Sequence, residues 1–304
     1  MSKALSIVMP VYEDGERASV AIRALLALSP PPEVSLEIIV VDDASRDNTA
    51  ELIAGMSERR VNLVKLTENQ GRAGACNEGA RHAVAGCLIF VDSDFLPETD
   101  QFLRAHYEAL RRGAVASVGH VFGFDGGFWD RYQREASWRR ERQFRQGITY
   151  AGNSNLAVRT SAFEEVGGYD GGFRRYGFED RDLLVRLSEV GTIAWASGAT
   201  VRHLDGLALG KVCRKMSEAG QWSAGRFARR HPEAYRKLGY AAIDCRYRPW
   251  LKPVASLFGA LTLRIADKAE PMLDAKWIPY ALRKGIVKLA SALSFTYGSL
   301  LARS

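Results

Sequence analysis

The chain has 304 residues, 47% hydrophobic and 25% charged, which is long enough for a full core and excludes disorder by composition. No apolar run reaches the ~18 residues needed to cross a bilayer. The N-terminus predicts a strand over residues 6–11 rather than a signal peptide. Four widely spaced cysteines match neither a zinc site nor a disulfide framework and favour reduced thiols in the cytoplasm.

The net charge of +7 is unevenly distributed along the chain. Residues 205–304 hold eighteen Lys or Arg against seven Asp or Glu, which gives +11, so the first 204 residues carry −4. A basic tail on a slightly acidic body predicts an anionic partner, such as a membrane surface, a nucleic acid or an acidic glycan. Because the chain has no recognisable nucleic-acid-binding motif, we do not expect nucleic acid to be that partner.

The first hundred residues alternate between predicted strands and predicted helices. Continuously apolar segments predict strands at 5–11, 36–41, 61–66 and 87–91. Helical spacing predicts helices at 18–28, 49–56 and 73–85. Such an alternation indicates a parallel sheet covered on both faces, typical of a Rossmann-like nucleotide-binding half. No Gly-x-Gly-x-x-Gly follows the first strand, so an NAD or FAD site is not expected.

Later segments are less regular. The pattern predicts a loop and a helix over 122–144, strands at 148–158, 192–196 and 199–203, and helices at 161–166 and 178–190. After residue 205, apolar residues recur at helical spacing beside Lys and Arg in two stripes: Val254, Leu257, Phe258, Leu261 and Ile265, and Leu282, Ile286, Leu289, Leu293, Tyr297 and Leu300. These basic amphipathic helices predict contact with a membrane interface; packing on the catalytic body or on a second subunit is the alternative.

Two carboxylates, Asp92 and Asp94, directly follow the predicted strand 87–91. In open α/β sheets, ligands bind at the carboxyl ends of the strands. Two neighbouring carboxylates repel each other and attract a hard divalent cation, which in turn can hold a diphosphate.

An ordered set of motifs resembles the inverting family-2 glycosyltransferases of GT-A fold over residues 4–204. The motifs are Pro10-Val11-Tyr12, Val41-Asp42-Asp43-Ala44-Ser45, Asn69-x-Gly71-Arg72-x-Gly74, Asp92-Ser93-Asp94, Gly152-Asn153-Ser154-Asn155, Gly167-Gly168-Tyr169-Asp170 and Gly177-Phe178-Glu179-Asp180. The resemblance implies a GT-A catalytic domain over 1–204, with a nucleotide-binding half (1–98) and a donor-sugar and acceptor half (99–204). A basic helical C-terminal region follows over 205–304.

The resemblance also assigns the nucleotide site. It implies that Asp43, or its neighbour Asp42, accepts a hydrogen bond from the base of a uridine nucleotide, with Pro10 and Tyr12 lining the same pocket. Arg72 is expected to reach the base or the diphosphate. The alternatives are that the Asp pair caps a helix or a turn, and that the arginine is a surface residue.

The Asp92-Ser93-Asp94 motif is expected to supply the contacts to the diphosphate and the metal. The resemblance implies that Asp94 binds Mn²⁺ or Mg²⁺, and that Asp92 contacts the ribose and at times the metal. Ser93 lies between them in the donor site. His203, after the strand 199–203, is expected to be a third ligand, and its imidazole favours Mn²⁺. A plain turn at the Asp pair and a structural histidine are the alternatives.

The acceptor side depends on the Glu-Asp pair. The resemblance implies that Asp180 is the general base and that Glu179 orients the acceptor and is the second choice for the base. A helix N-terminal charge is the alternative. Asn153 and Asn155 are expected under the transferred sugar.

These expectations describe a metal-dependent inverting glycosyltransferase that moves a sugar from a nucleotide diphosphate, UDP being favoured, to a hydroxyl of a glycan or lipid-linked acceptor. It would be cytoplasmic, peripheral at the inner face of the plasma membrane, with a homodimer left open. Two alternatives are weighed. A sugar nucleotidyltransferase would need a Gly-rich basic loop near the N-terminus, which is lacking. A non-catalytic glycan- or membrane-binding module would be marked by loss of Asp92, Asp94 or Asp180, which are all present.

Overall fold

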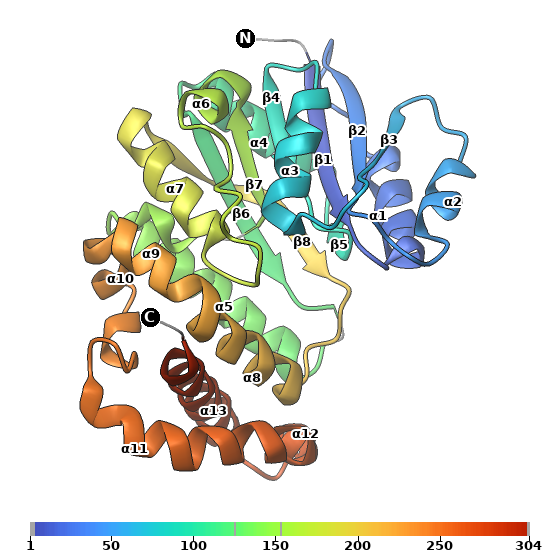
Figure 1. Cartoon of the computed structure of the whole chain (residues 1–304). Coiled ribbons are helices and arrows are strands. Elements are labelled where there is room, and N and C mark those ends of the chain that lie inside the picture. The colour runs from blue at the N-terminus through green and yellow to red at the C-terminus, as the bar shows by residue number, and fades with distance from the viewer. Residues whose placement is uncertain (1–3, 125, 153, 303–304) are drawn as a thin grey trace. The chain divides into compact units, whose positions relative to one another are not determined.

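The computed structural model describes residues 4–124, 126–152 and 154–302 (Figure 1). The chain divides into two compact units. The first comprises Met1–Phe124, Arg134–Arg174 and Asp180–Asp205. The second comprises Asp125–Gln133, Arg175–Glu179 and Gly206–Ser304.

The described residues of the first unit form one eight-stranded sheet in the order β3-β2-β1-β4-β7-β6-β8-β5 (Figure 1). Its first four strands are parallel and correspond to the four predicted strands: β1 (Ala4–Val11), β2 (Ser35–Asp42), β3 (Val61–Lys65) and β4 (Cys87–Phe90). The predicted helices between them are α1 (Gly15–Ala27), α2 (Thr49–Ala54) and α3 (Gly71–His82). The carboxyl ends of four parallel strands therefore meet at one edge.

The sheet is buried on both faces because apolar residues occupy both sides of its strands. On β1, Leu5, Ile7 and Met9 pack into a core that also contains residues of α1, α2 and α4 (Gln101–Arg111), whereas Val8 faces a second core. Residues of α3, α6 (Thr160–Glu165) and α7 (Glu179–Val190) complete that second core. Successive side chains of a strand point to opposite faces, so a continuously apolar strand fills both layers.

The other half of the sheet is mixed. The strand β7 (Leu156–Arg159) pairs antiparallel with β4 and with β6 (Ala116–Phe122). The strand β8 (Ile193–His203) pairs parallel with β6 and antiparallel with the short β5 (Phe95–Pro97). This last pairing sets Phe95 opposite His203 and so brings the two ends of the predicted metal site together.

Several sequence expectations were wrong in this half. The predicted strand over 148–158 is a short 3-10 turn, η1 (Thr149–Ala151), followed by β7. The two strands expected at 192–196 and 199–203 are the single strand β8. The strands β5 and β6 and the helix α4 were missed, whereas the helix within 122–144 is α5 (Phe128–Arg145).

A buried polar network joins β6, β8 and α4 through Asn155, the residue before β7. The side-chain amide of Asn155 donates to the carbonyls of His120 and Ala199, at 2.9 and 2.8 Å. Its Oδ1 lies 2.8 Å from Nε2 of His106, and because an amide oxygen only accepts, that nitrogen carries the proton. Nδ1 of His106 then accepts from Ser117, at 2.8 Å. The network corrects the prediction that Asn155 contacts the sugar, since its amide is used inside the sheet.

The His106 network predicts acid sensitivity. Burial lowers the pKa of His106 from 6.5 to about 4, against the hydrogen bond to Asn155, which raises it. Between pH 6.5 and 4 the unfolded chain therefore binds a proton that the folded chain does not, and stability falls as the pH falls through this window, by about 3 kcal/mol. Burial lowers the pKa of His120 as well, which adds in the same direction.

Denaturant unfolding at several pH values measures this loss. His106→Gln is expected to lower stability at pH 7 but to flatten its decline below pH 6.5. His82→Gln, at an exposed site on α3, is the matched control and should leave the decline unchanged. If stability falls with pH as steeply in His106→Gln as in His82→Gln, His106 is not the source of the acid sensitivity.

The second unit is helical and has its own core. Its helices include α8 (Leu209–Glu218), α9 (Ala224–Arg230), α10 (Pro232–Lys237), α12 (Ala260–Asp274) and α13 (Tyr280–Leu301). Ala266, Leu273 and Val287 pack with Phe128 and Trp129, and the Trp129 indole donates to Oε1 of Glu270 at 2.7 Å. Within the described residues, no helix combines the length and the apolar character needed to cross a bilayer.

Candidate functional site

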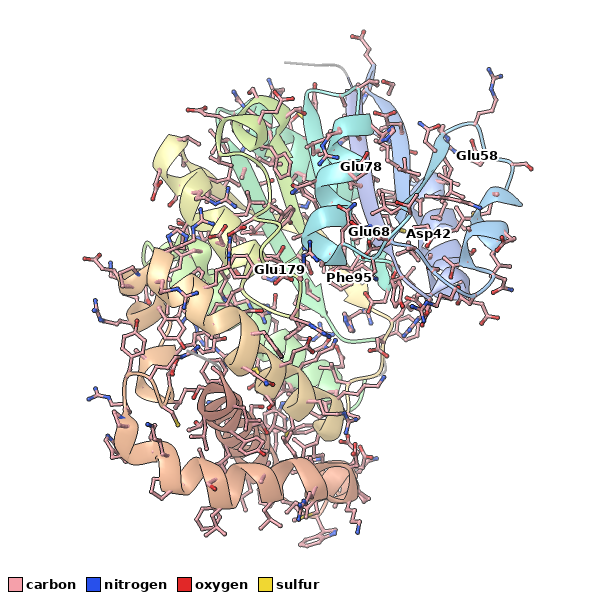
Figure 2. The ribbon with its side chains drawn as sticks, viewed as in Figure 1. Asp42, Glu58, Glu68, Glu78, Phe95 and Glu179 are labelled. Atoms are coloured by element: carbon pink, nitrogen blue, oxygen red, sulfur yellow. The ribbon has the colours of Figure 1, made fainter. Side chains whose placement is uncertain are left out.

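Charged side chains gather in the first unit where β2, β4 and β8 end and where α3 and α7 begin. The parallel strands bring Asp42, Asp43 and Asp92 to one edge of the sheet, and Figure 2 labels Asp42 at the end of β2. Asp180 joins them from the first turn of α7. The structure thus assembles residues that lie far apart in sequence.

The two carboxylates after β2 have different surroundings. Oδ1 of Asp42 accepts from the backbone N–H of Ser45 at 3.0 Å, which is the turn-forming role considered as the alternative. Oδ1 of Asp43 accepts from the N–H of Gln70 at 2.7 Å. Burial raises the pKa of Asp43, which the amides of Gln70 and Gly71 oppose and Asp42 reinforces. A raised pKa makes the Asp43 carboxylate a stronger hydrogen-bond acceptor, which suits a base N–H.

The remaining predicted nucleotide contacts lie at the end of β1. Pro10 is half-buried and pairs in register with Val41, one residue before Asp42. Tyr12 follows β1 and is 44% exposed, which leaves its ring accessible for stacking. A hydrogen bond to Glu13 raises the pKa of the Tyr12 hydroxyl.

Arg72 connects the donor and acceptor halves of the predicted site. Its Nε donates to Oδ1 of Asp92 at 2.7 Å and its Nη1 to Oδ1 of Asp180 at 2.9 Å. Burial favours the neutral guanidine, but Asp180 and Asp92 outweigh it and raise the pKa of Arg72 well above its usual value. Among the described residues, its buried Nη2 has no hydrogen-bond partner, so it is a donor suited to an anionic ligand.

Asp180 is held by two donors at one oxygen. The Tyr169 hydroxyl donates to Oδ1 of Asp180 at 3.0 Å, beside the bond from Arg72. Burial, followed by the Asp180 charge, raises the pKa of Tyr169 well above 10, so this hydroxyl stays protonated. Glu179, labelled in Figure 2, is buried and belongs to the second unit. The bonds orient Asp180 without covering its second oxygen, Oδ2.

Asp94 and His203 form the core of the predicted metal site. Nε2 of His203 lies 3.3 Å from Oδ2 of Asp94. Nδ1 of His203 lies 2.9 Å from the carbonyl oxygen of Asp205 and must carry the proton, because a carbonyl only accepts. In the neutral ring, the lone pair of Nε2 therefore faces the carboxylate of Asp94. A cation bound between the two could be ligated by both.

The donor set fits a divalent cation in part. Within the described residues, no group of three or more His, Cys, Asp or Glu side chains is arranged to hold a metal ion. Asp92, which was expected to contact the ribose and at times the metal, is bonded to Arg72. Asp94 and His203 thus supply two ligands, one oxygen and one nitrogen, and a Mn²⁺ or Mg²⁺ there would complete its shell with diphosphate oxygens and water.

A chain of hydrogen bonds runs from Ser93 to His203, and the sequence did not predict it. The Ser93 hydroxyl donates to Oδ2 of Asp14 at 2.9 Å, and Nε of Arg17 donates to Oδ1 of Asp14 at 2.6 Å. Nη1 of Arg17 donates to Oδ1 of Asp205 at 3.1 Å, and the Asp205 carbonyl accepts from His203. This chain of hydrogen bonds links the Ser93 hydroxyl to the loop that holds His203. No spacing in the sequence indicates that Asp14 and Arg17 lie close to Asp205.

Two predicted sugar contacts do not appear in this group. Asn153 lies outside the described residues. Asn155 belongs to the His106 network within the sheet. Tyr169 was part of a motif but had no assigned role; the only signal for it was the Gly-Gly-Tyr-Asp sequence.

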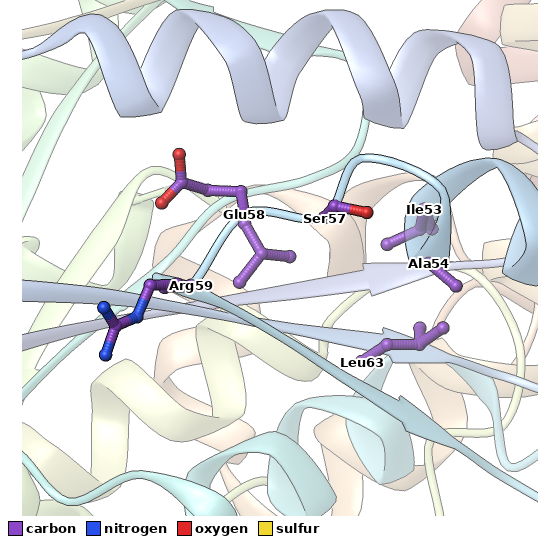
Figure 3. A pocket seen from close by; sticks show the side chains of 7 residues that line it. Ile53, Ala54, Ser57, Glu58, Arg59 and Leu63 are labelled. Atoms are coloured by element: carbon purple, nitrogen blue, oxygen red, sulfur yellow. The ribbon is translucent and has the colours of Figure 1, made fainter.

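A small hollow of about 200 Å³ lies elsewhere in the first unit, between the end of α2 and the start of β3 (Figure 3). Ile53, Ala54, Glu58 and Leu63 are among its lining residues. It is at the amino end of a parallel strand, whereas ligands of open α/β sheets bind at the carboxyl ends. We do not assign it to the site.

Comparison with solved structures identifies the fold. A mannosyltransferase from Pyrobaculum calidifontis, solved in complex with GDP-Man and Mn²⁺, superposes with a TM-score of 0.63 over 99% of this chain and 87% of that chain, at 19% identity. This similarity confirms the predicted GT-A fold with C-terminal helices.

Sequence comparison gives the family. The succinoglycan biosynthesis protein ExoO of Rhizobium meliloti is 33% identical over 124 residues, 40% of this chain and 35% of that protein. An undecaprenyl-phosphate 4-deoxy-4-formamido-L-arabinose transferase of Pectobacterium carotovorum is 37% identical over 120 residues, 38% of this chain and 37% of that protein. The matches thus span about a third of these relatives.

Two family models match the chain. One, described as the N-terminal domain of galactosyltransferase, matches residues 141–199. The other, glycosyl transferase family 2, matches residues 6–167, which is more than half of the chain and includes Arg72 and the Asp92-Ser93-Asp94 motif. The chain belongs to glycosyl transferase family 2, an inverting glycosyltransferase family.

Proposed function

We propose that this protein is a metal-dependent inverting glycosyltransferase that transfers a sugar from a nucleotide diphosphate, UDP being favoured, to a hydroxyl or phosphate of a glycan or lipid-linked acceptor. The observation that carries the proposal is Arg72, which joins Asp92 to Asp180. The Arg72 guanidinium thereby bonds both Asp92, on the predicted leaving-group side, and Asp180, the predicted base. We assign the catalytic role to residues 1–204, and the C-terminal region 205–304 to the acceptor side at a membrane surface.

The donor would be held by residues of the first unit. Asp43 accepts from the base N–H, Tyr12 stacks on the base, and Asp92 accepts from the ribose. Arg72 is buried and charged, with Nη2 left to donate to a diphosphate oxygen. Asp94 and His203 would hold a divalent cation, which when bound neutralises the negative charge of the departing nucleoside diphosphate.

The transfer itself is a single displacement. The acceptor oxygen forms a bond to the anomeric carbon while the bond from that carbon to the phosphate oxygen breaks. Both hydrogen bonds to Asp180 reach Oδ1, so we assign Oδ2 to receive the proton of a hydroxyl acceptor. A phosphate acceptor, as in the name of the undecaprenyl-phosphate relative, is already ionised and needs the base less.

A thermal-shift panel tests the donor and the metal together. We expect a UDP-sugar to raise the melting temperature more with Mn²⁺ than without it, because nucleotide and cation bind as one unit. GDP-sugars belong in the panel, since the Pyrobaculum structure holds GDP-Man. If no nucleotide sugar shifts the melting temperature in either condition, the proposed function fails.

Asp94→Ala tests the cation site. We expect it to lower the Mn²⁺ affinity about tenfold or more and to abolish slow hydrolysis of the UDP-sugar, because only His203 is left to hold the ion. Titration with Mn²⁺ and hydrolysis assays measure the two effects. Asp100→Ala is the control, since Asp100 is exposed and its side chain makes no capping bond to α4. Unchanged Mn²⁺ affinity in Asp94→Ala would remove Asp94 from the site.

A further inference from the structure

Large apolar side chains are exposed along one stretch of the second unit. Trp277 is 84% exposed, Trp250 69% and Leu257 65%. Four more exposed apolar residues lie between them: Phe258, Leu261, Ile265 and Met272. We call these seven residues the outer stripe. Single exposed apolar residues are ordinary on a protein surface, but a series of them marks an interaction surface for a protein, a membrane or a ligand.

Five residues of the outer stripe lie on the helical segment formed by η5 (Ala255–Gly259) and α12, whereas Trp250 precedes that segment and Trp277 follows it. Leu257 lies in the π-helical turn η5, and Leu261 and Ile265 follow at four-residue intervals into α12. An adjacent face of α12 is already used, because Ala266 and Leu273 are buried in the core of the unit. The predicted stripe therefore points away from that core. In α13, likewise, Val287, Ala290 and Phe295 are buried, while Leu282 and Leu289 of the second predicted stripe are exposed.

Positive charge accompanies the outer stripe. Arg264 and Lys268 are exposed on α12, with Lys268 three residues after Ile265 and four before Met272, so that it lies within the stripe. Exposed basic residues also flank both ends: Arg248, Lys252 and Lys276.

The acidic residues of α12 are mostly engaged on the other side. Asp267 pairs with Arg214 at 2.7 Å. Glu270 accepts from the Trp129 indole at 2.7 Å, and Asp274 is exposed near the end of the helix. The face that carries the apolar residues is therefore the basic one.

We propose that the outer stripe binds an anionic lipid surface, with its leucine, isoleucine and phenylalanine side chains among the acyl chains and its Lys and Arg at the headgroups. The combination of an apolar stripe, tryptophans at both ends and basic side chains between them is that of helices lying in a membrane interface. Trp250 and Trp277 suit the headgroup level, where amphipathic rings concentrate. The inference is compatible with a lipid-linked acceptor but does not depend on transfer.

Sedimentation with vesicles tests the proposal. The full chain should bind vesicles of phosphatidylcholine mixed with phosphatidylglycerol. Its affinity for pure phosphatidylcholine vesicles should be at least about tenfold lower, because each basic residue near an anionic surface adds to the binding free energy. The triple variant Leu257→Ser, Leu261→Ser, Ile265→Ser should lose about 30-fold or more in affinity for the anionic vesicles. Arg264→Gln with Lys268→Gln should lose about tenfold and much of the preference for anionic lipid.

The control variant is Val84→Ser, which changes an 84% exposed apolar residue of the first unit. It should leave vesicle binding unchanged. An unchanged melting temperature establishes that the triple variant is folded; should it unfold, Leu261→Ser alone, about threefold weaker in binding, replaces it. Equal binding by the triple variant and the parent chain would overturn the proposal.

Two further outcomes separate the proposal from its rivals. A triple variant that turns a dimer into a monomer in light scattering, while vesicle binding is unaffected, would make the outer stripe a subunit interface and overturn the lipid proposal. A chain that binds anionic vesicles but no nucleotide sugar would support lipid binding and remove the proposed transferase function alone. Lipid binding by the outer stripe and the transferase function can therefore each be rejected without rejecting the other.

Discussion

Asp180→Asn is expected to lower transfer to a hydroxyl acceptor about 1,000-fold or more while nucleotide-sugar and Mn²⁺ binding persist. A positioned general base contributes ~10²–10⁴ to a rate, and an amide cannot take the proton. The side chains have nearly the same shape, and an amide oxygen still accepts from Arg72 and Tyr169. The loss should therefore appear in kcat rather than in donor affinity.

Steady-state kinetics with a hydroxyl acceptor, together with calorimetric titration of the donor, measure the two quantities. Glu189→Gln is the matched control because it makes the same chemical change on the exposed side of α7. It should retain full activity. An Asp180→Asn enzyme with near-parental kcat would remove Asp180 as the base and direct attention to Glu179.

The nucleotide-binding half could be read from the sequence because its strands are continuously apolar. β1, β2 and β4 are buried on both faces, so local composition alone distinguishes them from the helices between. The mixed half could not be read in this way. β6 contains Ser117, Gly119 and His120, whose polar groups are satisfied by distant residues such as His106 and Asn155. Tertiary contacts, rather than periodicity, make that segment a strand.

The candidate site shows the same division. The motifs singled out Asp43, Arg72, Asp94 and Asp180 as candidates, since each stands directly beside an element boundary in a recognisable order. They did not distinguish Asn155 as a core residue, because a buried amide and a sugar-binding amide look alike in sequence. The hydrogen bonds of Asp14 through Arg17 to Asp205 join residues up to 188 positions apart, and no local pattern encodes them.

Arg72→Met is expected to impair both stability and transfer. It leaves the carboxylates of Asp92 and Asp180 partly buried without their shared cation, at a cost of about 2–3 kcal/mol in the free energy of unfolding. Arg81→Met, on the exposed side of the same helix, is the control; its pair with Glu78 is a surface one, so little change is expected.

Arg72→Lys separates the charge of Arg72 from its geometry. An ammonium keeps the positive charge but cannot reproduce a planar guanidinium that bonds Asp92 through Nε and Asp180 through Nη1. We expect stability to recover largely, while kcat remains at least about tenfold below that of the parent chain. Because Arg72 orients Asp180, Arg72→Lys combined with Asp180→Asn should lower kcat by less than the product of the two single losses. Fully additive losses in the double variant would mean that Arg72 acts only on the donor, through Nη2, and not through the base.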